Sequence, residues 1–211
     1  MDAKLWDRYM AEVTQCARVC PTIEEAEEAV RVIIRWMGDD PNREGLLKTP
    51  RRVLDYYKKS CSGYAPELLS HYSLLPYDGS SSEMVLVKNI GFSSNCEHHL
   101  SPICGVAHIA YMPKEKILGI GSIAHIVGCF AKRLQLQERL TNQVAEYLEK
   151  ILEPHGIAVL LEAEHWCVEC SNRDTASRDE RLNVQTSQML GVFEERCDLR
   201  NEFFLRIKMY K

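Results

Sequence analysis

No stretch of this sequence is apolar over the roughly 18 residues that a membrane-spanning helix needs. Its opening residues, MDAKLWDRYMAEV, lack the basic segment and apolar core of a secretory signal. An excess of positive charge is also missing, because the formal net charge is −4, which argues against nucleic acid or an anionic membrane as a partner. The 9 cysteines are an odd count, which speaks against a complete disulfide framework. We therefore predict a cytoplasmic protein with reduced thiols, some of them metal ligands.

The N-terminal part of the sequence has the apolar period of helices. Apolar residues recur at helical spacing over residues 5–19, and again between Thr22 and Gly38. Thr22 followed by Glu25 is the pattern of a capping box, and Gly38 is suited to end the helix. Pro50 marks the first turn of a further helix. This part of the chain is thus expected to be helical.

The pattern changes after the polar stretch DGSSSE at residues 78–83, which is the best candidate for a domain boundary. Strands flanking two successive helices are expected beyond it and indicate the α+β class. We predict an N-terminal helical region over residues 1–80 and a catalytic domain over residues 81–211. The expected elements are strands over 84–92, 106–112, 157–169 and 187–193, helices over 122–134 and 137–152, and a helix or strand over 201–209.

The densest group of reactive side chains is NCEHHLSPICG, residues 95–105. Cys96 and His99 have the Cys-x-x-His spacing that lets one short turn present two ligands to a metal ion, and zinc favours sulfur and imidazole nitrogen. Structural packing seldom requires two adjacent imidazoles beside a thiol. A third ligand is expected from EHWCVEC, where Cys167 would share one face of a strand with His165.

Three protein ligands leave one position of zinc open for water, which is typical of catalytic rather than structural sites. Such water ionises near neutral pH and can attack an electrophilic carbon. His98 and His165 would then act beside it as proton donors or acceptors. The alternative is a structural Cys-x-x-Cys zinc site made by Cys167 and Cys170, but no second pair of this kind follows in the sequence.

Several blocks of the sequence resemble the GTP cyclohydrolase I family: DDPNREGLLKTPRRV, CEHHLSPICGVAHIAYMP, LQLQERLTNQVA, EAEHWC and SQMLGVF. They cover most of the chain in the family's order. The resemblance implies the tunnelling fold, in which antiparallel sheets and paired helices assemble around an axis, typically as a homo-oligomeric decamer with active sites at subunit interfaces. It also implies zinc on Cys96, His99 and Cys167, and proton transfer by His98 and His165.

The resemblance further implies how a purine is bound and opened. In the family, water attacks C8 of the guanine ring of GTP, formate leaves, and a sugar rearrangement gives dihydroneopterin triphosphate. Glu138 matches the carboxylate that accepts two hydrogen bonds from guanine N1–H and the 2-amino group. Gln137 lies beside it in the purine-binding stretch. Glu138 could otherwise be an exposed carboxylate at the start of a helix, stabilised by the helix dipole.

The sequence departs from the family where the triphosphate is held. The family has a Ser-Lys-x-x-Arg pattern at the start of one helix, but the matching positions here are Gly121, Ser122 and His125. A further phosphate-binding arginine of the family falls near Ser171. The polar stretch over residues 170–184 carries arginines that could substitute for these lost cations.

We predict a zinc-dependent cyclohydrolase that opens the imidazole ring of a guanine-like purine with little or no phosphate, with Ser122 and His125 beside the substrate. Loss of the family's serine at Gly121 indicates a reaction that stops before a pterin forms. One alternative is an ordinary GTP cyclohydrolase I that draws its cations from the altered loop or a neighbouring subunit. Another is a non-catalytic zinc-bound regulatory paralogue, which the retention of both His98 and His165 disfavours.

Overall fold

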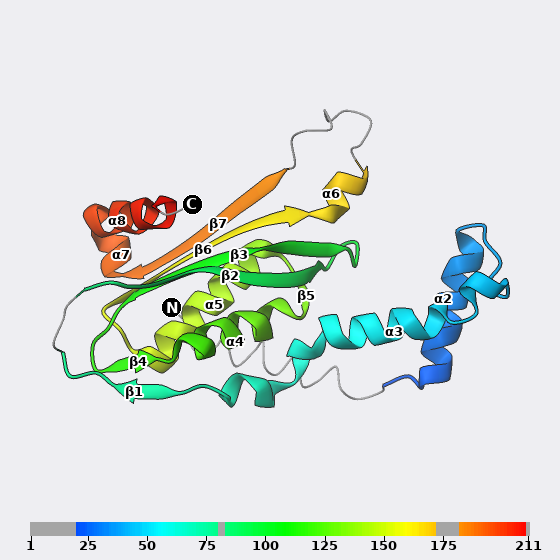
Figure 1. Cartoon of the computed structure of the whole chain (residues 1–211), viewed down its shortest axis with the longest axis horizontal. Coiled ribbons are helices and arrows are strands. Elements are labelled where there is room, and N and C mark those ends of the chain that lie inside the picture. The colour runs from blue at the N-terminus through cyan, green and yellow to red at the C-terminus, as the bar shows by residue number, and fades with distance from the viewer. Residues whose placement is uncertain (1–19, 80–82, 172–181, 210–211) are drawn as a thin grey trace.

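The computed structural model describes residues 20–79, 83–171 and 182–209 of the chain. These residues form a five-stranded sheet with helices on both faces, and a helical arm that extends beyond one end of the sheet (Figure 1). The predicted α+β class is confirmed. Within these ranges, none of the helices combines the length and the apolar character that crossing a membrane requires.

The sheet has the strand order β5-β2-β3-β6-β7. The four long strands pair antiparallel, whereas the short β5 pairs parallel to β2. A bulge in β2, where Asn89 has a φ of 59°, shifts the register with β3 between Val87 and Ile90. The strands predicted in this part are present, and they are longer than expected at several ends. Their bounds are β2 (Val85–Cys96), β3 (Pro102–Met112), β5 (Leu134–Gln135), β6 (Gly156–His165) and β7 (Asn183–Gly191).

Helices α4 (Ile120–Ala131) and α5 (Gln137–Leu152) cover one face of the sheet (Figure 1). Their buried side chains recur every three or four residues and pack on the inward face of the strands, as expected for helices with one apolar stripe. The predicted helix over 137–152 is confirmed. The predicted helix over 122–134 is shorter at its end, because Leu134 leaves α4 and pairs with β2. The main core includes Ile123, Ile126, Phe130, Leu140, Val144, Leu148, Ile109, Val159 and Leu161.

The opposite face carries α7 (Val192–Glu195) and α8 (Cys197–Lys208) near one end of the sheet. The segment that the sequence left untyped is therefore helical. The strand predicted over 187–193 was wrong at its end, since β7 stops at Gly191. The φ of 58° at Gly191 turns the chain into α7, and a left-handed φ of this kind suits glycine. A second core joins Phe193, Leu199 and Phe203 to Ala110, Ala158 and Leu160 of the sheet.

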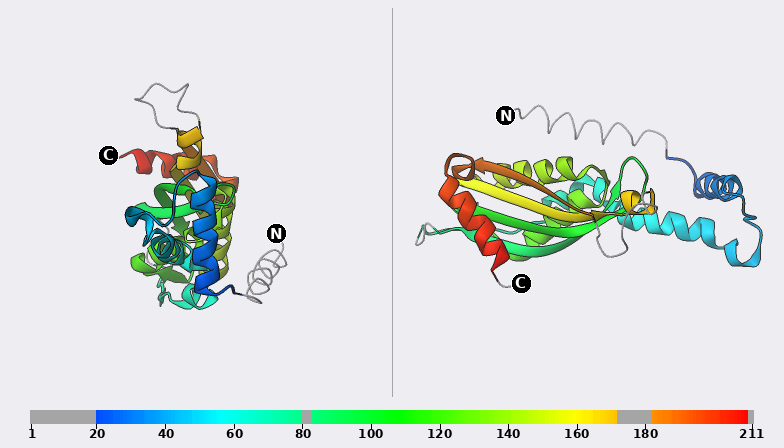
Figure 2. Two further views of the ribbon diagram at one scale, coloured as in Figure 1. Left: turned by 90° about the vertical axis from the view of Figure 1, so that its right-hand side faces the viewer. Right: turned by 90° about the horizontal axis from the view of Figure 1, so that it is seen from above.

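The arm consists of α2 (Ile23–Trp36) and α3 (Thr49–Ser60), joined through the 3-10 turn η2 (Glu44–Leu46). Figure 2 shows both helices beyond the end of the sheet. The predicted capping box is confirmed: the Thr22 N–H donates to the Glu25 carboxylate at 2.7 Å, and the Glu25 N–H donates to the Thr22 hydroxyl at 3.2 Å. The helix predicted over residues 5–19 lies outside the described residues.

The chain returns from the arm to the sheet through η3 (Ser62–Tyr64), η4 (Pro66–Ser70) and β1 (Leu74–Pro76). A side chain at Gly63 would place its Cβ 2.0 Å from the Cys129 carbonyl oxygen, so only glycine lets η3 approach α4 this closely. β1 then pairs with β4 (Lys116–Leu118). The predicted boundary at residue 80 lies between these paired strands and stays a prediction.

Candidate metal centre

One end of the sheet gathers the residues with metal-ligand and acid–base chemistry. Antiparallel pairing puts the end of β2, the start of β3 and the end of β6 side by side, with Ile103 opposite His165. The parallel pairing of Cys96 with Gln135 brings in β5, which α5 follows directly. Helix α6 (Trp166–Ser171) begins at this same end (Figure 1). We call this region the metal end.

Three residues predicted as zinc ligands lie together at the metal end. One ligand atom from each of Cys96, His99 and Cys167 lies within 4.8 Å of the other two, and the Cys96 sulfur is 3.8 Å from Nδ1 of His99. Two sulfurs and one imidazole are a donor set that zinc favours, so the residues fit this ion. Cys96 is buried, Cys167 is half-buried and His99 is exposed, so solvent reaches the group on the side of His99.

The two thiols of this group affect each other. Burial, and then the neighbouring Cys96 thiol, raises the pKa of the Cys167 thiol. Metal ligation acts in the opposite direction, because only the thiolate is a ligand. Ligation of a metal ion by this pair would therefore release the thiol protons.

The turn that carries His99 is held by backbone bonds at both of its ends. The Leu100 N–H donates to the Cys96 carbonyl at 2.8 Å, and the Cys96 N–H donates to the Ser101 carbonyl at 2.8 Å. Leu100 takes a left-handed φ of 55° to close this turn. The Tyr57 hydroxyl, from α3, donates to the Leu100 carbonyl at 3.2 Å. The arm thus contacts the ligand turn directly.

Glu97, which lies between the ligands Cys96 and His99, forms a two-bond ion pair with Arg139 of α5. The guanidinium donates to the two carboxylate oxygens at 2.5 and 3.2 Å. The Arg139 hydrogen bonds hold the pKa of Glu97 below its usual range. The sequence analysis missed this pair. Both residues stand in the blocks CEHHL and QERLT, but 42 residues separate them and no local pattern joins them.

The two histidines predicted for proton transfer have different surroundings. The side chain of His98 is 63% exposed and lies 3.9 Å from the Glu97 carboxylate. His165 is half-buried, and its Nε2 lies 2.7 Å from the side-chain oxygen of Gln137. Burial lowers the pKa of His165, and the charge of Glu138 opposes this shift. His165 is therefore favoured as the neutral imidazole, the form that can accept a proton.

The strand predicted over residues 157–169 was wrong beyond His165, because helix α6 begins at Trp166. Strand β6 loses its partners at this point: its pairing with β3 ends at Ile103 opposite His165, and its described pairing with β7 ends at Glu164. The alternation argument that placed Cys167 beside His165 therefore does not apply. Cys167 reaches the cluster from the first turn of a helix.

Gln137 and Glu138, both predicted to bind the purine, differ in exposure. Gln137 is only 2% exposed, and its amide contacts the Leu161 and Val184 carbonyls and His165. Glu138 is exposed in the first turn of α5. A role for Gln137 in substrate binding stays a prediction, and its contacts favour a different one.

Gly121, Ser122 and His125, the positions that match the phosphate-binding pattern of the family, lie at the start of α4, which we call the clamp end. The Ser122 hydroxyl accepts the N–H of Ser73 at 3.0 Å, and His125 Nε2 lies 2.7 Å from the Leu68 carbonyl. The C-terminal end of α4 leads to β5 at the metal end, so about ten helical residues, or roughly 15 Å, separate Ser122 from it. Within one chain the two ends are apart (Figure 1).

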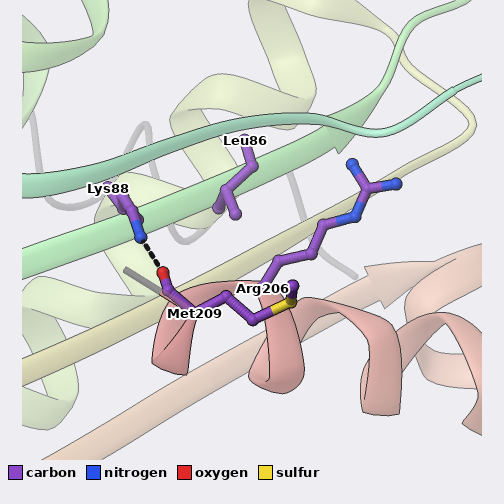
Figure 3. Close-up of a pocket in the computed structure, with 4 residues that line it drawn as sticks. All are labelled: Leu86, Lys88, Arg206 and Met209. Carbon is purple, nitrogen blue, oxygen red and sulfur yellow. Dashed lines mark hydrogen bonds between the residues drawn. The ribbon is translucent and has the colours of Figure 1, made fainter. Parts of the chain in front are cut away.

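A separate pocket of about 390 Å³ lies between β2 and α8 (Figure 3). Leu86, Lys88, Arg206 and Met209 line it, at the end of β2 opposite to Cys96. Its cations already have protein partners: Lys88 Nζ donates to the Met209 carbonyl, and Arg206 pairs with Glu202. This pocket is remote from the metal end and takes no part in the site.

Two solved structures show a distant likeness to this chain. An archaeosine synthase, QueF-Like in the apo form, aligns with a TM-score of 0.40 and 17% identity over 52% of this chain and 95% of that chain. A dihydroneopterin aldolase from Burkholderia aligns with a TM-score of 0.34 and 14% identity over 51% of this chain and 90% of that chain.

Comparison with curated sequences finds much closer relatives. The GTP cyclohydrolase 1 of Brucella anthropi is 49% identical over 150 residues, which cover 70% of each chain. That of Brucella canis is 42% identical over 190 residues, which cover 89% of this chain and 87% of the relative. The family model for GTP cyclohydrolase I matches residues 26–208. This match spans the sheet, the helices on both faces and the Cys-His-Cys cluster, and the chain therefore belongs to the GTP cyclohydrolase I family of metal-dependent cyclohydrolases.

Proposed function

We propose that this protein is a zinc-dependent cyclohydrolase that opens the imidazole ring of a guanine-like purine carrying little or no phosphate. The observation that carries the proposal is the contrast between a complete set of metal and acid–base residues and the uncharged side chains at the clamp end. Water adds at C8 and the C8–N9 bond breaks, which leaves C8 as a formyl group on N7. A second water then hydrolyses the C8–N7 bond and releases formate. A free base has no sugar to rearrange, so the reaction would end before a pterin forms.

Cys96, His99 and Cys167 would hold the zinc ion. When bound, zinc would supply Lewis-acid activation of water for attack on an electrophilic carbon. The half-buried His165 is suited to accept a proton, because its surroundings favour the neutral imidazole. The exposed His98 would donate a proton to the departing nitrogen. The two imidazoles thus divide the acid and base roles according to their exposure.

Glu138 would select the base. Its carboxylate is exposed in the first turn of α5. The residue before it, Gln137, contacts His165, and the residue after it, Arg139, contacts Glu97. A carboxylate can accept two parallel hydrogen bonds from N1–H and the 2-amino group of guanine. An adenine-like edge offers no such pair of donors, so recognition of guanine would survive without any phosphate contact.

The clamp end lacks the charge that a triphosphate requires. Gly121, Ser122 and His125 supply no permanent cation, and the two polar side chains are engaged with backbone groups of the preceding segment. Hydrogen bonds to charged groups contribute about 1.5–3 kcal/mol each, so the loss of two or three cations would weaken phosphate binding by several kcal/mol. Histidine is only partly charged at neutral pH and cannot replace a bidentate guanidinium.

A complete site would need more than one copy of the chain. The clamp end lies at the far end of α4 from the cluster, so one subunit cannot present both to one small molecule. The outer edge of β7 and most of the outer edge of β2 have no strand partner among the described residues. Such edges readily pair with another chain. We infer a homo-oligomer with active sites at subunit interfaces, as the family resemblance implies.

The second candidate is GTP itself, and the relatives named GTP cyclohydrolase 1 favour it. In this case the cations would come from another part of the assembly. A non-catalytic role is disfavoured, because a structural metal site needs ligands but no flanking pair of acid–base histidines.

Formate release by the zinc-loaded protein, measured on GTP, guanosine, guanine and oxidised guanine, tests these functions. Our proposal expects release from a compound without phosphate and weak or no release from GTP. Calorimetric binding on the same panel is the second measurement. Micromolar binding of GTP, with no binding of the dephosphorylated compounds, would establish GTP as the substrate. Formate from none of the four compounds, with zinc bound, would support the non-catalytic alternative.

A further inference from the structure

We propose that Gln137 is a positioning residue: its side-chain amide fixes the ring of His165 with the proton on Nε2 and the lone pair on Nδ1. The assignment of the ring nitrogens stands on hydrogen-bond geometry alone. Its consequence for turnover rests on the proposed function, in which His165 accepts a proton.

The orientation of the Gln137 amide is determined by two carbonyl groups. Its Nε2 lies 3.2 Å from the Leu161 carbonyl oxygen and 2.9 Å from the Val184 carbonyl oxygen. Both partners can only accept hydrogen bonds, so the NH₂ group must face them. A flipped amide would place its oxygen against two other oxygens, and hydrogen-bond networks of this kind decide amide assignments.

The tautomer of His165 follows from this orientation. The remaining amide atom, Oε1 of Gln137, is an acceptor and lies 2.7 Å from Nε2 of His165. Nε2 must therefore carry a hydrogen, and in a neutral imidazole the other nitrogen is then the acceptor. The base atom of His165 would be Nδ1. A second-layer contact that sets which ring nitrogen is protonated is the usual way for a protein to orient a functional histidine.

The amide is anchored where the start of α5 packs against β6 and β7. Gln137 is 2% exposed and begins α5, and its own carbonyl accepts the hydroxyl of Thr141 at 2.8 Å. The carbonyls that it meets belong to β6 and β7, and β6 is the strand that ends at His165. A movement of the amide would thus break its contacts to β6, to β7 and to His165. Because all atoms of the amide are engaged, purine recognition would fall to Glu138.

The variant Gln137→Met tests this inference, because methionine keeps the length of the side chain but lacks the amide. It has no N–H to donate to the two carbonyls, and its sulfur is only a weak acceptor for the Nε2–H of His165. Gln143→Met is the matched control: Gln143 lies on the same helix, is 8% exposed, and bonds to Gln135 instead of a histidine. The primary measurement is a long-range ¹H–¹⁵N spectrum of the zinc-loaded, ¹⁵N-histidine-labelled full chain. It is recorded at mildly alkaline pH, and His165 is identified by its absence in His165→Ala.

In the wild type, we expect the spectrum to show His165 protonated on Nε2. In Gln137→Met, the preference for this tautomer should be lost, and in Gln143→Met it should be unchanged. With whichever purine releases formate, Gln137→Met should lower kcat by about 10- to 100-fold, the range of second-layer contacts, while KM changes by less than about twofold. A wild-type His165 that carries its proton on Nδ1 overturns the inference. An unchanged tautomer in Gln137→Met together with a large rise in KM also overturns it, and would return Gln137 to substrate binding. The spectrum needs no substrate, so it determines the tautomer of His165 even if the proposed function is wrong.

Discussion

The metal end and the clamp end of this protein use their polar side chains in opposite ways. At the metal end, Cys96, His99 and Cys167 come from a turn and a helix remote in sequence, and their ligand atoms face one another. At the clamp end, the Ser122 hydroxyl meets the backbone of Ser73, just before β1, and His125 meets the backbone of Leu68 in η4. The first arrangement leaves donor atoms available for a ligand, and the second uses them within the fold. The two ends therefore differ in whether the fold already uses their polar atoms.

The removal of a candidate metal ligand is expected to have the largest effect. Cys167→Ser should lower zinc affinity by at least about 100-fold, because two ligands hold zinc poorly. The fold should persist, because Cys167 is only partly buried at the margin of the main core and serine is of similar size. Zinc per subunit after dialysis, with circular dichroism for the fold, measures this. Cys104→Ser, at an exposed thiol on β3, is the control. Stoichiometric zinc in Cys167→Ser, with its loss in Cys170→Ser, would contradict the ligand assignment.

The next largest effect concerns the acid–base histidines. His98→Ala and His165→Ala should each retain zinc and lower formate release by about 100-fold or more, the contribution of general acid–base groups. His155→Ala, at an exposed histidine at the far end of β6, should change neither quantity. If His98→Ala lost zinc as completely as His99→Ala, then His98 would be a ligand and this division of roles would be wrong.

The clamp end is tested by restoring charge. The double variant Ser122→Lys, His125→Arg should bind GTP about 10- to 100-fold more tightly for each cation that reaches the phosphates, with little change in binding of guanine. It should also be less stable, because His125 no longer meets the Leu68 carbonyl. Calorimetry with both compounds measures the shift. Unchanged GTP affinity in a folded double variant would mean that the clamp end does not face the substrate.

A smaller effect is expected from the ion pair that supports the ligand turn. Arg139→Met should lower zinc affinity by about tenfold, because Glu97 lies between two candidate ligands and loses both hydrogen bonds from the Arg139 guanidinium. Arg139→Lys keeps the charge but not the two-bond geometry, and should lie between the variant and the wild type. Zinc competition with a chelator gives the affinities. Equal zinc affinity in all three proteins would show that the Glu97–Arg139 ion pair does not support the metal site.

The smallest effect is one of stability near the clamp end. The Tyr147 hydroxyl donates to the Leu69 carbonyl of η4 at 2.6 Å, and Tyr147→Phe leaves this carbonyl without its donor. The free energy of unfolding should fall by about 1–2 kcal/mol. Urea denaturation measures it, and Tyr56→Phe, at a side chain 45% exposed, should cost less. A loss in Tyr56→Phe as large as that in Tyr147→Phe would contradict the role of burial.

The same bond predicts a dependence on pH. Burial raises the pKa of Tyr147 to about 12, above the value near 10 of an unfolded chain. The folded state then holds the phenolic proton more tightly, so the associated stability is present below about pH 10 and is lost as the pH rises towards 12. The difference between wild type and Tyr147→Phe should shrink over this window. A constant difference across it would contradict the assignment.

Local patterns in the sequence were sufficient for much of the fold. The capping box of Thr22 and Glu25 and the full span of α5 were both predictable, because helix signals act over three or four residues. The sequence predictions failed where the structure of a segment depends on contacts with distant segments. Strand β6 ends at His165, where its pairing with β3 ends, and α8 could not be typed because its apolar residues meet a sheet face formed by distant strands.

The sequence by itself determined the kinds of atoms in the candidate site: two thiols and an imidazole at ligand spacing, two further histidines, a carboxylate, and no cation at the clamp positions. Only the tertiary structure decided which of them meet. It brought Cys167 to the cluster on a helix, paired Glu97 with Arg139, and placed the Gln137 amide between two carbonyls and His165. The physical reason is that spacing along the chain limits contacts over one or two turns, whereas contacts between distant segments depend on strand pairing and register, which no local period encodes.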